Sequence, residues 1–169
     1  WSNARGSNML DGGAHFYGVY ETADGKFLSI GSIEPQFYAL LLDKLAIDPA
    51  SLPHQMDPRH WQAVRERLEA VFRTRTRDHW CSVMEGTDIC FAPVLGLDEV
   101  ADHPHARERA AFLQEGGVWQ PAPAPRFSRT MPASPAGAVA PGADTDSILA
   151  MLGMQADGIA ALRAAGVVA

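Results

Sequence analysis

Two short apolar runs lie between residues 17 and 30 and flank the polar turn Thr22-Ala23-Asp24-Gly25. An Asp-Gly pair between β-forming residues favours a hairpin, because glycine accepts a positive φ without steric cost. The pair Glu34-Pro35 follows, and proline suits the first position of a helix because its missing N–H is not needed there. We therefore expect a hairpin over 17–30 and a helix over 34–45 that has Glu34 at or next to its N-cap.

Apolar residues spaced three or four positions apart predict two further helices. The first begins at Asp57-Pro58, and the second is capped by Thr76 and stops at Gly86. A short apolar run over 90–94 predicts an edge strand, since Pro93 cannot donate a hydrogen bond to a neighbouring strand. The expected fold class is α+β: a small antiparallel sheet, made of the hairpin and one short strand, covered on one face by three helices.

The composition changes along the chain and divides it into three parts. Residues 1–8 are polar and predict an extended linker, and residues 9–115 hold the elements of a small α+β domain. Residues 116–169 are rich in proline and glycine and predict an extended arm with little core of its own. We expect this arm to end in short helical segments, over 144–152 and 157–165.

The overall composition excludes several classes of protein. A chain of 169 residues with 47% hydrophobic residues is long enough for a modest core, and its net charge of -6 argues against a nucleic-acid partner. No apolar run reaches the roughly 18 residues that a membrane span needs. The two cysteines, Cys81 and Cys90, form no C-x-x-C pair or metal-ligand spacing, so we expect them to be small buried residues of a cytoplasmic protein.

Four segments carry a resemblance to a known family. They read RGSNMLDGGAHFY from Arg5, ADGKFLSIGSIEPQFY from Ala23, GTDICFAPV from Gly86 and PAPRFSRT from Pro123. In this order and spacing they resemble the α-methylacyl-CoA racemase branch of the family III CoA-transferases, over nearly the whole chain. Members of that family have a larger N-terminal domain, which implies that this chain corresponds to their C-terminal half and that residues 1–8 lead in from the absent domain.

The resemblance implies an isomerase that epimerises 2-methylacyl-CoA thioesters in lipid metabolism. A base removes the α-proton and an acid returns one, and in the racemase branch this His/Asp pair lies in the N-terminal half. The chain alone is therefore expected to be inactive, and the intact enzyme to be an interlocked homodimer. CoA is part of the substrate, and neither a separate cofactor nor a metal is expected. Two alternatives stay open: a family III CoA-transferase with an Asp nucleophile in the absent half, or a non-catalytic dimerisation or binding module.

Glu34 is the candidate catalytic residue, because it matches the Glu of the family's IEPQFY motif. There it is implied to hydrogen-bond the catalytic His of the large domain and so to orient it. The alternative is a plain N-cap. Tyr17, Ile33 and Phe16 are the candidate substrate-binding residues, since they are apolar and adjoin these loops. The alternative for them is core packing of the hairpin.

Other polar residues fit structural roles better. Asp11, next to Gly12-Gly13, is expected to form a side-chain turn rather than to act as an acid. His103 and His105 are expected in a solvated loop, because no further metal ligands accompany them.

Four positions concern the family pattern or the substrate phosphates. His15 stands where relatives commonly have Pro, and Asp144 where many have His, so a CoA contact by that His is not carried over. Arg126 and Arg129 are candidates to meet phosphates, although a surface role is favoured.

Overall fold

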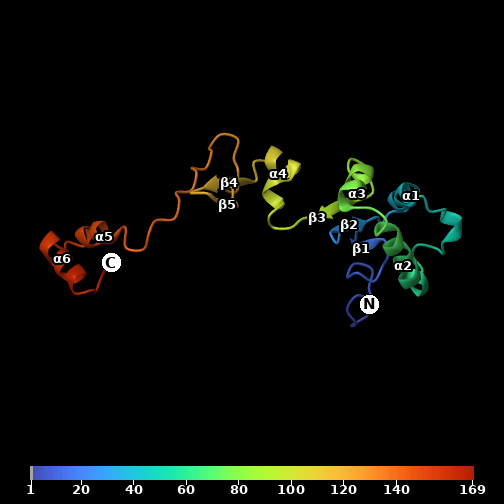
Figure 1. Cartoon of the computed structure of the whole chain (residues 1–169), viewed down its shortest axis with the longest axis horizontal. Coiled ribbons are helices and arrows are strands. Elements are labelled where there is room, and N and C mark those ends of the chain that lie inside the picture. Colours follow the sequence, from blue (N-terminus) through green and yellow to red (C-terminus); the bar gives the residue numbers. More distant parts are fainter. Residues whose placement is uncertain (1) are drawn as a thin grey trace. The chain divides into compact units, whose positions relative to one another are not determined.

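The computed structural model describes residues 2–169, which form two compact units that divide between Asp98 and Glu99 (Figure 1). The expected boundary between residues 115 and 116 differs from this division, because it would cut through a pair of hydrogen-bonded strands in the second unit. Trp1, the first residue of the predicted linker, lies outside the described residues. Residues 2–8 are not extended: the Asn8 side chain accepts a hydrogen bond from the Ser2 N–H and donates one to the Ser2 carbonyl, which closes a loop.

The first unit contains an antiparallel sheet of three strands in the order β1-β2-β3. Its strands are β1 (Tyr17–Glu21), β2 (Phe27–Gly31) and β3 (Phe91–Val94). The hairpin register pairs Tyr20 with Leu28, and the connecting turn is closed by a 2.9 Å hydrogen bond from the Thr22 N–H to the Lys26 carbonyl. Gly25 has φ +71, which a residue with a side chain adopts rarely. The hairpin and the edge strand are confirmed.

Three α-helices follow the hairpin in this unit: α1 (Pro35–Lys44), α2 (Trp61–Phe72) and α3 (Arg77–Met84). Short 3₁₀ turns lie at Pro49–Ser51 and Pro58–His60. Asp57 accepts a hydrogen bond from the Arg59 N–H as predicted for a cap, but it caps the 3₁₀ turn, and the α-helix begins later, at Trp61. Thr76 caps α3 by accepting a hydrogen bond from the His79 N–H, as predicted.

The core lies between the inner face of the sheet and the three helices. Strand residues that alternate along the chain point to one face, and the helices present stripes spaced three and four residues apart. The main buried side chains are Tyr20, Leu28 and Ile30 from the strands and Tyr38, Leu41, Leu42, Val64, Leu68, Phe72, Trp80 and Met84 from the helices. The α+β fold class is therefore confirmed.

The second unit carries one 3₁₀ turn, three α-helices and two strands. These are the 3₁₀ turn Val100–Asp102, α4 (Pro104–Glu108), β4 (Phe112–Glu115), β5 (Val118–Pro121), α5 (Thr145–Met151) and α6 (Ala156–Ala164). The two C-terminal helices match the predicted segments, and residues 122–144 contain no helix or strand. Strands β4 and β5 form a hairpin about Gly116 and Gly117, both with positive φ, which the sequence analysis did not predict. Among the helices of residues 2–169, none has both the length and the apolar character required to cross a membrane.

Candidate functional site

The candidate site is built at the point where strand β2 passes into helix α1. Glu34 has φ -69 and ψ 140 at the N-cap of α1, and its carbonyl accepts hydrogen bonds from the Phe37 and Tyr38 N–H groups. Its side chain does not cap the helix: no hydrogen bond runs to it from the first turn. Glu34 is exposed, and its carboxylate has no hydrogen-bond or ion-pair partner among residues 2–169. The carboxylate is therefore accessible to a group outside these residues.

The backbone in front of Glu34 is held from several sides. The Ser32 hydroxyl, fully buried, donates to the Ile89 carbonyl at 2.6 Å, and the Ile33 N–H donates to the Gly31 carbonyl at 2.8 Å. The side-chain amide of Gln55 donates to the carbonyls of both Ser32 and Ile33, each at 3.0 Å. Gln55 was not singled out in the sequence, because nothing local to residue 55 indicates a contact more than 20 residues away.

The three residues proposed to bind substrate do not line one common surface. Tyr17 is 36% exposed and lines a shallow groove of about 280 Å³ on the outer side of the sheet, together with Val19, Ser29, Gly31 and Cys90. Ile33 is half-buried against the core and does not line this groove. Phe16 is fully buried, with its ring edge-on to Trp61 at 5.9 Å, so the structure places it in the core rather than on a pocket wall.

The two cysteines differ from the prediction that both are buried. Cys90 is exposed, because it precedes β3 opposite Gly31 on the side of the sheet that the helices leave uncovered, and it has φ +60. Cys81 is half-buried in α3, where burial raises the pKa of its thiol to about 11. A thiol with a raised pKa stays protonated near neutral pH, which makes Cys81 a poor nucleophile.

Asp11 is engaged within its own loop. One carboxylate oxygen accepts from the Asn8 N–H at 2.7 Å and the other from the Asn8 side-chain amide at 2.8 Å. These hydrogen bonds, that from the Asn8 side chain above all, lower the pKa of Asp11 from its ordinary value. Asp11 is thus ionised and committed to the turn, which is the structural role favoured by the sequence.

Arg65 of α2 ties this loop to the sheet. Its guanidinium donates to the Gly12 carbonyl and to the Val19 carbonyl, both at 3.1 Å, and lies 4.9 Å from the centre of the Tyr20 ring. Arg65 Nε also lies 3.3 Å from a carboxylate oxygen of Glu69, four residues further along α2. Through these two carbonyls Arg65 holds the loop of residues 8–13 against β1.

Gly13 sits where the loop closes on itself. A Cβ built at Gly13 would lie 2.6 Å from the Asn8 carbonyl oxygen, which is closer than real contacts allow. We expect Gly13→Ala to lower the free energy of unfolding by about 1–2 kcal/mol, since the backbone must shift to admit the methyl group. Urea denaturation followed by circular dichroism measures this.

The matched control for this change is Gly158→Ala. Gly158 lies in helix α6, and a Cβ built there would meet only the flexible side chain of Met154. Alanine also favours a helix, so no loss of stability is expected. Equal stability of the two variants would contradict the close approach at Gly13.

His15 and Tyr38 form a buried polar pair beneath the site. His15 Nε2 lies 2.9 Å from the Tyr38 hydroxyl, and the Tyr20 hydroxyl donates to the His15 carbonyl at 2.5 Å. Burial lowers the pKa of His15 to about 4, with a smaller contribution from the positive charge of Arg65. Burial likewise raises the pKa of Tyr38 to about 12. Both groups are neutral at pH 7 and serve the packing of the hairpin on α1.

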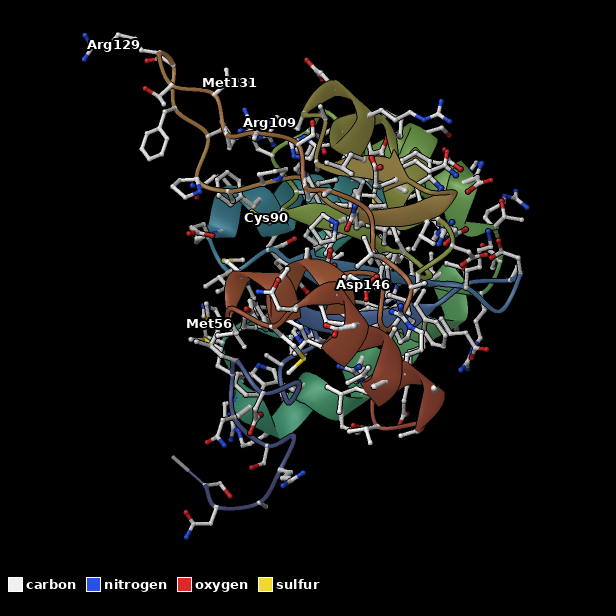
Figure 2. All side chains as sticks on the ribbon, turned by 90° about the vertical axis from the view of Figure 1, so that its left-hand side faces the viewer. Met56, Cys90, Arg109, Arg129, Met131 and Asp146 are labelled. Atoms are coloured by element: carbon white, nitrogen blue, oxygen red, sulfur yellow. The ribbon has the colours of Figure 1, made fainter. Side chains whose placement is uncertain are left out.

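The polar candidate residues of the second unit lie on helix α4 and on the segment after β5. His103 is the N-cap residue of α4 and His105 lies within that helix, so this segment is helical rather than the predicted loop. Arg126 donates a hydrogen bond to the Arg109 carbonyl, and Arg129 is exposed on the segment that carries Met131 (Figure 2). No three His, Cys, Asp or Glu side chains of residues 2–169 cluster so that they could hold a metal ion.

Asp144 stands at the N-cap of α5 without a side-chain hydrogen bond to the helix. It borders an apolar groove of about 470 Å³ formed mainly by residues 139–145 and α5. None of the other candidate residues lines that groove.

Comparison of the chain with known proteins identifies the family that its sequence matches. The family model described as CoA-transferase family III matches residues 2–146. The chain is 48% identical to the alpha-methylacyl-CoA racemase of Mus musculus over 136 residues and 45% identical to that of Homo sapiens over 137 residues. Each match covers 80% of this chain and 35% of the relative, so the chain spans about a third of the length of these proteins.

More distant matches agree with this assignment. A CaiB/baiF CoA-transferase family protein of Caenorhabditis elegans is 32% identical over 118 residues, which cover 70% of this chain and 33% of that protein. Among solved structures, Rv3272 from M. tuberculosis is 16% identical with a TM-score of 0.56, over 67% of this chain and 32% of that one. At this identity the structural match shows a shared fold.

Proposed function

Because the chain belongs to CoA-transferase family III, we propose that it supplies Glu34 to the active site of an α-methylacyl-CoA racemase. This enzyme epimerises 2-methylacyl-CoA thioesters at the α-carbon. The proposal is supported by the high identity to two racemases and carried by a single observation: the exposed Glu34 carboxylate has no partner among residues 2–169. A carboxylate that neither caps its helix nor pairs with a cation is suited to bind a group supplied from elsewhere.

The proposed reaction requires particular chemical groups. The α-proton of a thioester is weakly acidic, so one group removes it from one face of the carbon and another returns a proton to the opposite face. The enolate oxygen formed between these two steps needs stabilisation by hydrogen-bond donors. We propose that a His and an Asp outside this chain act as the acid/base pair. Glu34 then accepts a hydrogen bond from the second imidazole nitrogen, which fixes the tautomer of the His and stabilises its protonated form.

The proposal also assigns the substrate side of the site. Tyr17, exposed on the groove beside Gly31, and Ile33, next to Glu34 but outside that groove, contact different parts of the acyl group, whereas the buried Phe16 does not touch it. CoA enters as part of the substrate, and no separate cofactor is proposed. The large domain that carries the acid/base pair is proposed to belong to a second subunit, which makes the active enzyme a homodimer.

Glu34→Gln is the direct test, made in the full-length protein that carries this chain. Glutamine keeps the shape of the side chain but lacks the charge that stabilises an imidazolium. We expect kcat for exchange of the α-proton of a 2-methylacyl-CoA in D₂O to fall roughly 10–100-fold, with KM little changed. Deuterium incorporation measured by mass spectrometry gives both constants.

Glu66→Gln serves as the control, since Glu66 is exposed on α2 and its one hydrogen bond among residues 2–169 is accepted from Gln62. Its activity should equal that of the parent. An unchanged kcat in Glu34→Gln would refute the role proposed for Glu34.

A further inference from the structure

The side-chain amide of Gln55 holds the two peptide carbonyls that immediately precede Glu34. Its Nε2 lies 3.0 Å from the Ser32 carbonyl oxygen and 3.0 Å from the Ile33 carbonyl oxygen. Both partners are acceptors, so the group between them must carry two N–H donors. Among uncharged side chains of this length only glutamine provides them. Residue 55 is therefore chemically matched to this stretch of backbone.

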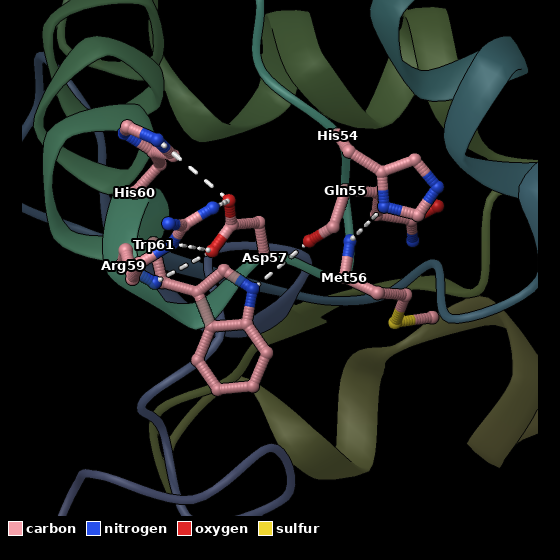
Figure 3. A network of polar contacts seen from close by, with 7 residues as sticks. All are labelled: His54, Gln55, Met56, Asp57, Arg59, His60 and Trp61. Atoms are coloured by element: carbon pink, nitrogen blue, oxygen red, sulfur yellow. Dashed lines mark hydrogen bonds and ion pairs between the residues drawn. The ribbon is translucent and has the colours of Figure 1, made fainter.

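Gln55 is itself anchored to the core. The backbone carbonyl of Gln55 accepts a hydrogen bond from the indole N–H of Trp61 at 2.9 Å (Figure 3). Trp61 begins helix α2, and its ring meets the buried Phe16 edge-on with an interplanar angle of 88°. The adjoining turn is closed by Asp57, which forms a paired contact with Arg59 at 2.6 and 2.9 Å. The amide of Gln55 thus transmits the position of α2 to the backbone in front of Glu34.

The segment that Gln55 contacts is held by individual hydrogen bonds rather than by a regular element. Residues 32–34 belong to no helix or strand, and Pro35 has no N–H to donate. The Glu34 carboxylate has no partner among residues 2–169, so its direction depends on the backbone that carries it. Apart from those with Gln55, Ser32 and Ile33 make one hydrogen bond each among residues 2–169, to Ile89 and to Gly31. Loss of the Gln55 amide would remove two of these four hydrogen bonds.

We propose that Gln55 is a positioning residue for Glu34. By fixing the Ser32 and Ile33 peptides it sets the direction in which the Glu34 carboxylate leaves the start of α1, and hence the geometry of its hydrogen bond to the imidazole. A displacement of the order of 1 Å in such a contact lowers catalytic rate strongly. The inference rests on the proposed function of Glu34, but it concerns a residue that makes no contact with substrate.

Gln55→Met in the full-length protein that carries this chain is the first test. Methionine has a similar length but no donor, so both carbonyls lose their partner. We expect kcat for α-proton exchange to fall about tenfold with KM little changed. Gln62→Met is the matched control: Gln62 is exposed on α2 and donates only to Glu66 among residues 2–169, so its kcat should equal that of the parent.

A double-mutant cycle separates positioning from a general effect on the fold. If Gln55 acts through Glu34, Gln55→Met should cause little further loss of kcat in a Glu34→Gln background. The same tenfold loss in both backgrounds would overturn the inference, since Gln55 would then act independently of Glu34. The Glu34→Gln variant alone decides the proposed function, so the two ideas fail in different measurements.

Gln55→Glu provides a second readout if Gln55→Met does not fold. An ionised carboxylate cannot donate to the two carbonyls, but its protonated form can donate to one. Relative to the parent enzyme at each pH, kcat of Gln55→Glu should therefore recover in part as the pH falls through the pKa of the new carboxyl. A ratio to the parent that stays constant with pH would count against the proposal.

Discussion

Replacing Phe72 by alanine should lower the free energy of unfolding by about 4 kcal/mol. Phe72 is the last residue of α2, and its side chain is fully buried. Its ring centre lies 4.9 Å from that of Tyr20 on the sheet and 5.4 Å from that of Trp80 on α3, so the ring joins three elements. Alanine would remove these contacts and leave a cavity. Because small domains are stable by only about 5–15 kcal/mol, this single change should remove a large fraction of the stability.

Urea denaturation of the chain, followed by far-ultraviolet circular dichroism, measures this loss. Phe127→Ala is the matched control, because it makes the same chemical change at a ring that is 58% exposed; its unfolding free energy should stay within about 0.5 kcal/mol of the parent. If Phe72→Ala does not fold, Phe72→Leu, which keeps most of the apolar volume, should fold with a smaller loss. A loss below 1 kcal/mol in Phe72→Ala would show that this contact does not organise the core.

The local elements of the first unit were predictable because their signals lie within a few residues of one another. Asp24-Gly25 indicated the hairpin turn, and Thr76 indicated the start of α3, since a capping side chain acts on an N–H three residues away. The same kind of signal was present and overlooked at Gly116-Gly117, between two short strands. Two glycines flanked by alternating residues favour a hairpin just as Asp-Gly does.

The alternation of side chains between the two faces of a strand also bears on which candidate residues can line a pocket. Phe16 and Tyr17 were both proposed to line a pocket, yet neighbouring residues at a strand point to opposite faces. Tyr17, the first residue of β1, is exposed, whereas Phe16, in the turn just before the strand, is buried. The exposure of Cys90 could not be predicted in this way. It depends on the outer face of the sheet being uncovered, and no local sequence pattern indicates that.

The contacts that shape the candidate site could not be predicted from the sequence, since they join residues far apart along the chain. Gln55 reaches back 22 and 23 residues to Ile33 and Ser32, and Arg65 reaches back 53 residues to Gly12. Each lies on a polar stretch where an exposed position is the ordinary expectation. The motif around Glu34 indicated where the site lies, but only the packing of α2 showed which residues hold it in place.

A fall in pH from 6.5 to 4 should destabilise the chain, with about 3 kcal/mol of the loss due to His15. The His15 side chain is almost fully buried, and its Nδ1 has no hydrogen-bond partner among residues 2–169. Burial, and then the charge of Arg65, lower its pKa to about 4 from an ordinary value of 6.5. Between these two pH values the unfolded chain binds a proton at His15 that the folded chain does not bind. The contribution of neutral His15 to the free energy of unfolding is therefore fully present above pH 6.5 and is lost as the pH falls to 4.

Comparison of the parent with His15→Gln isolates this contribution, because glutamine is polar but does not titrate. The difference in unfolding free energy between parent and variant, measured in urea from pH 7 to pH 4, should change by about 3 kcal/mol in favour of the variant. His105→Gln, at an exposed position of α4, should keep the pH dependence of the parent. Asp57, whose pKa is lowered to about 2 chiefly by its hydrogen bond with Arg59, is present in both parent and variant, so its titration cancels from this difference. Parallel curves for parent and His15→Gln would mean that the folded chain admits a proton at His15, and that the pair with Tyr38 opens to water.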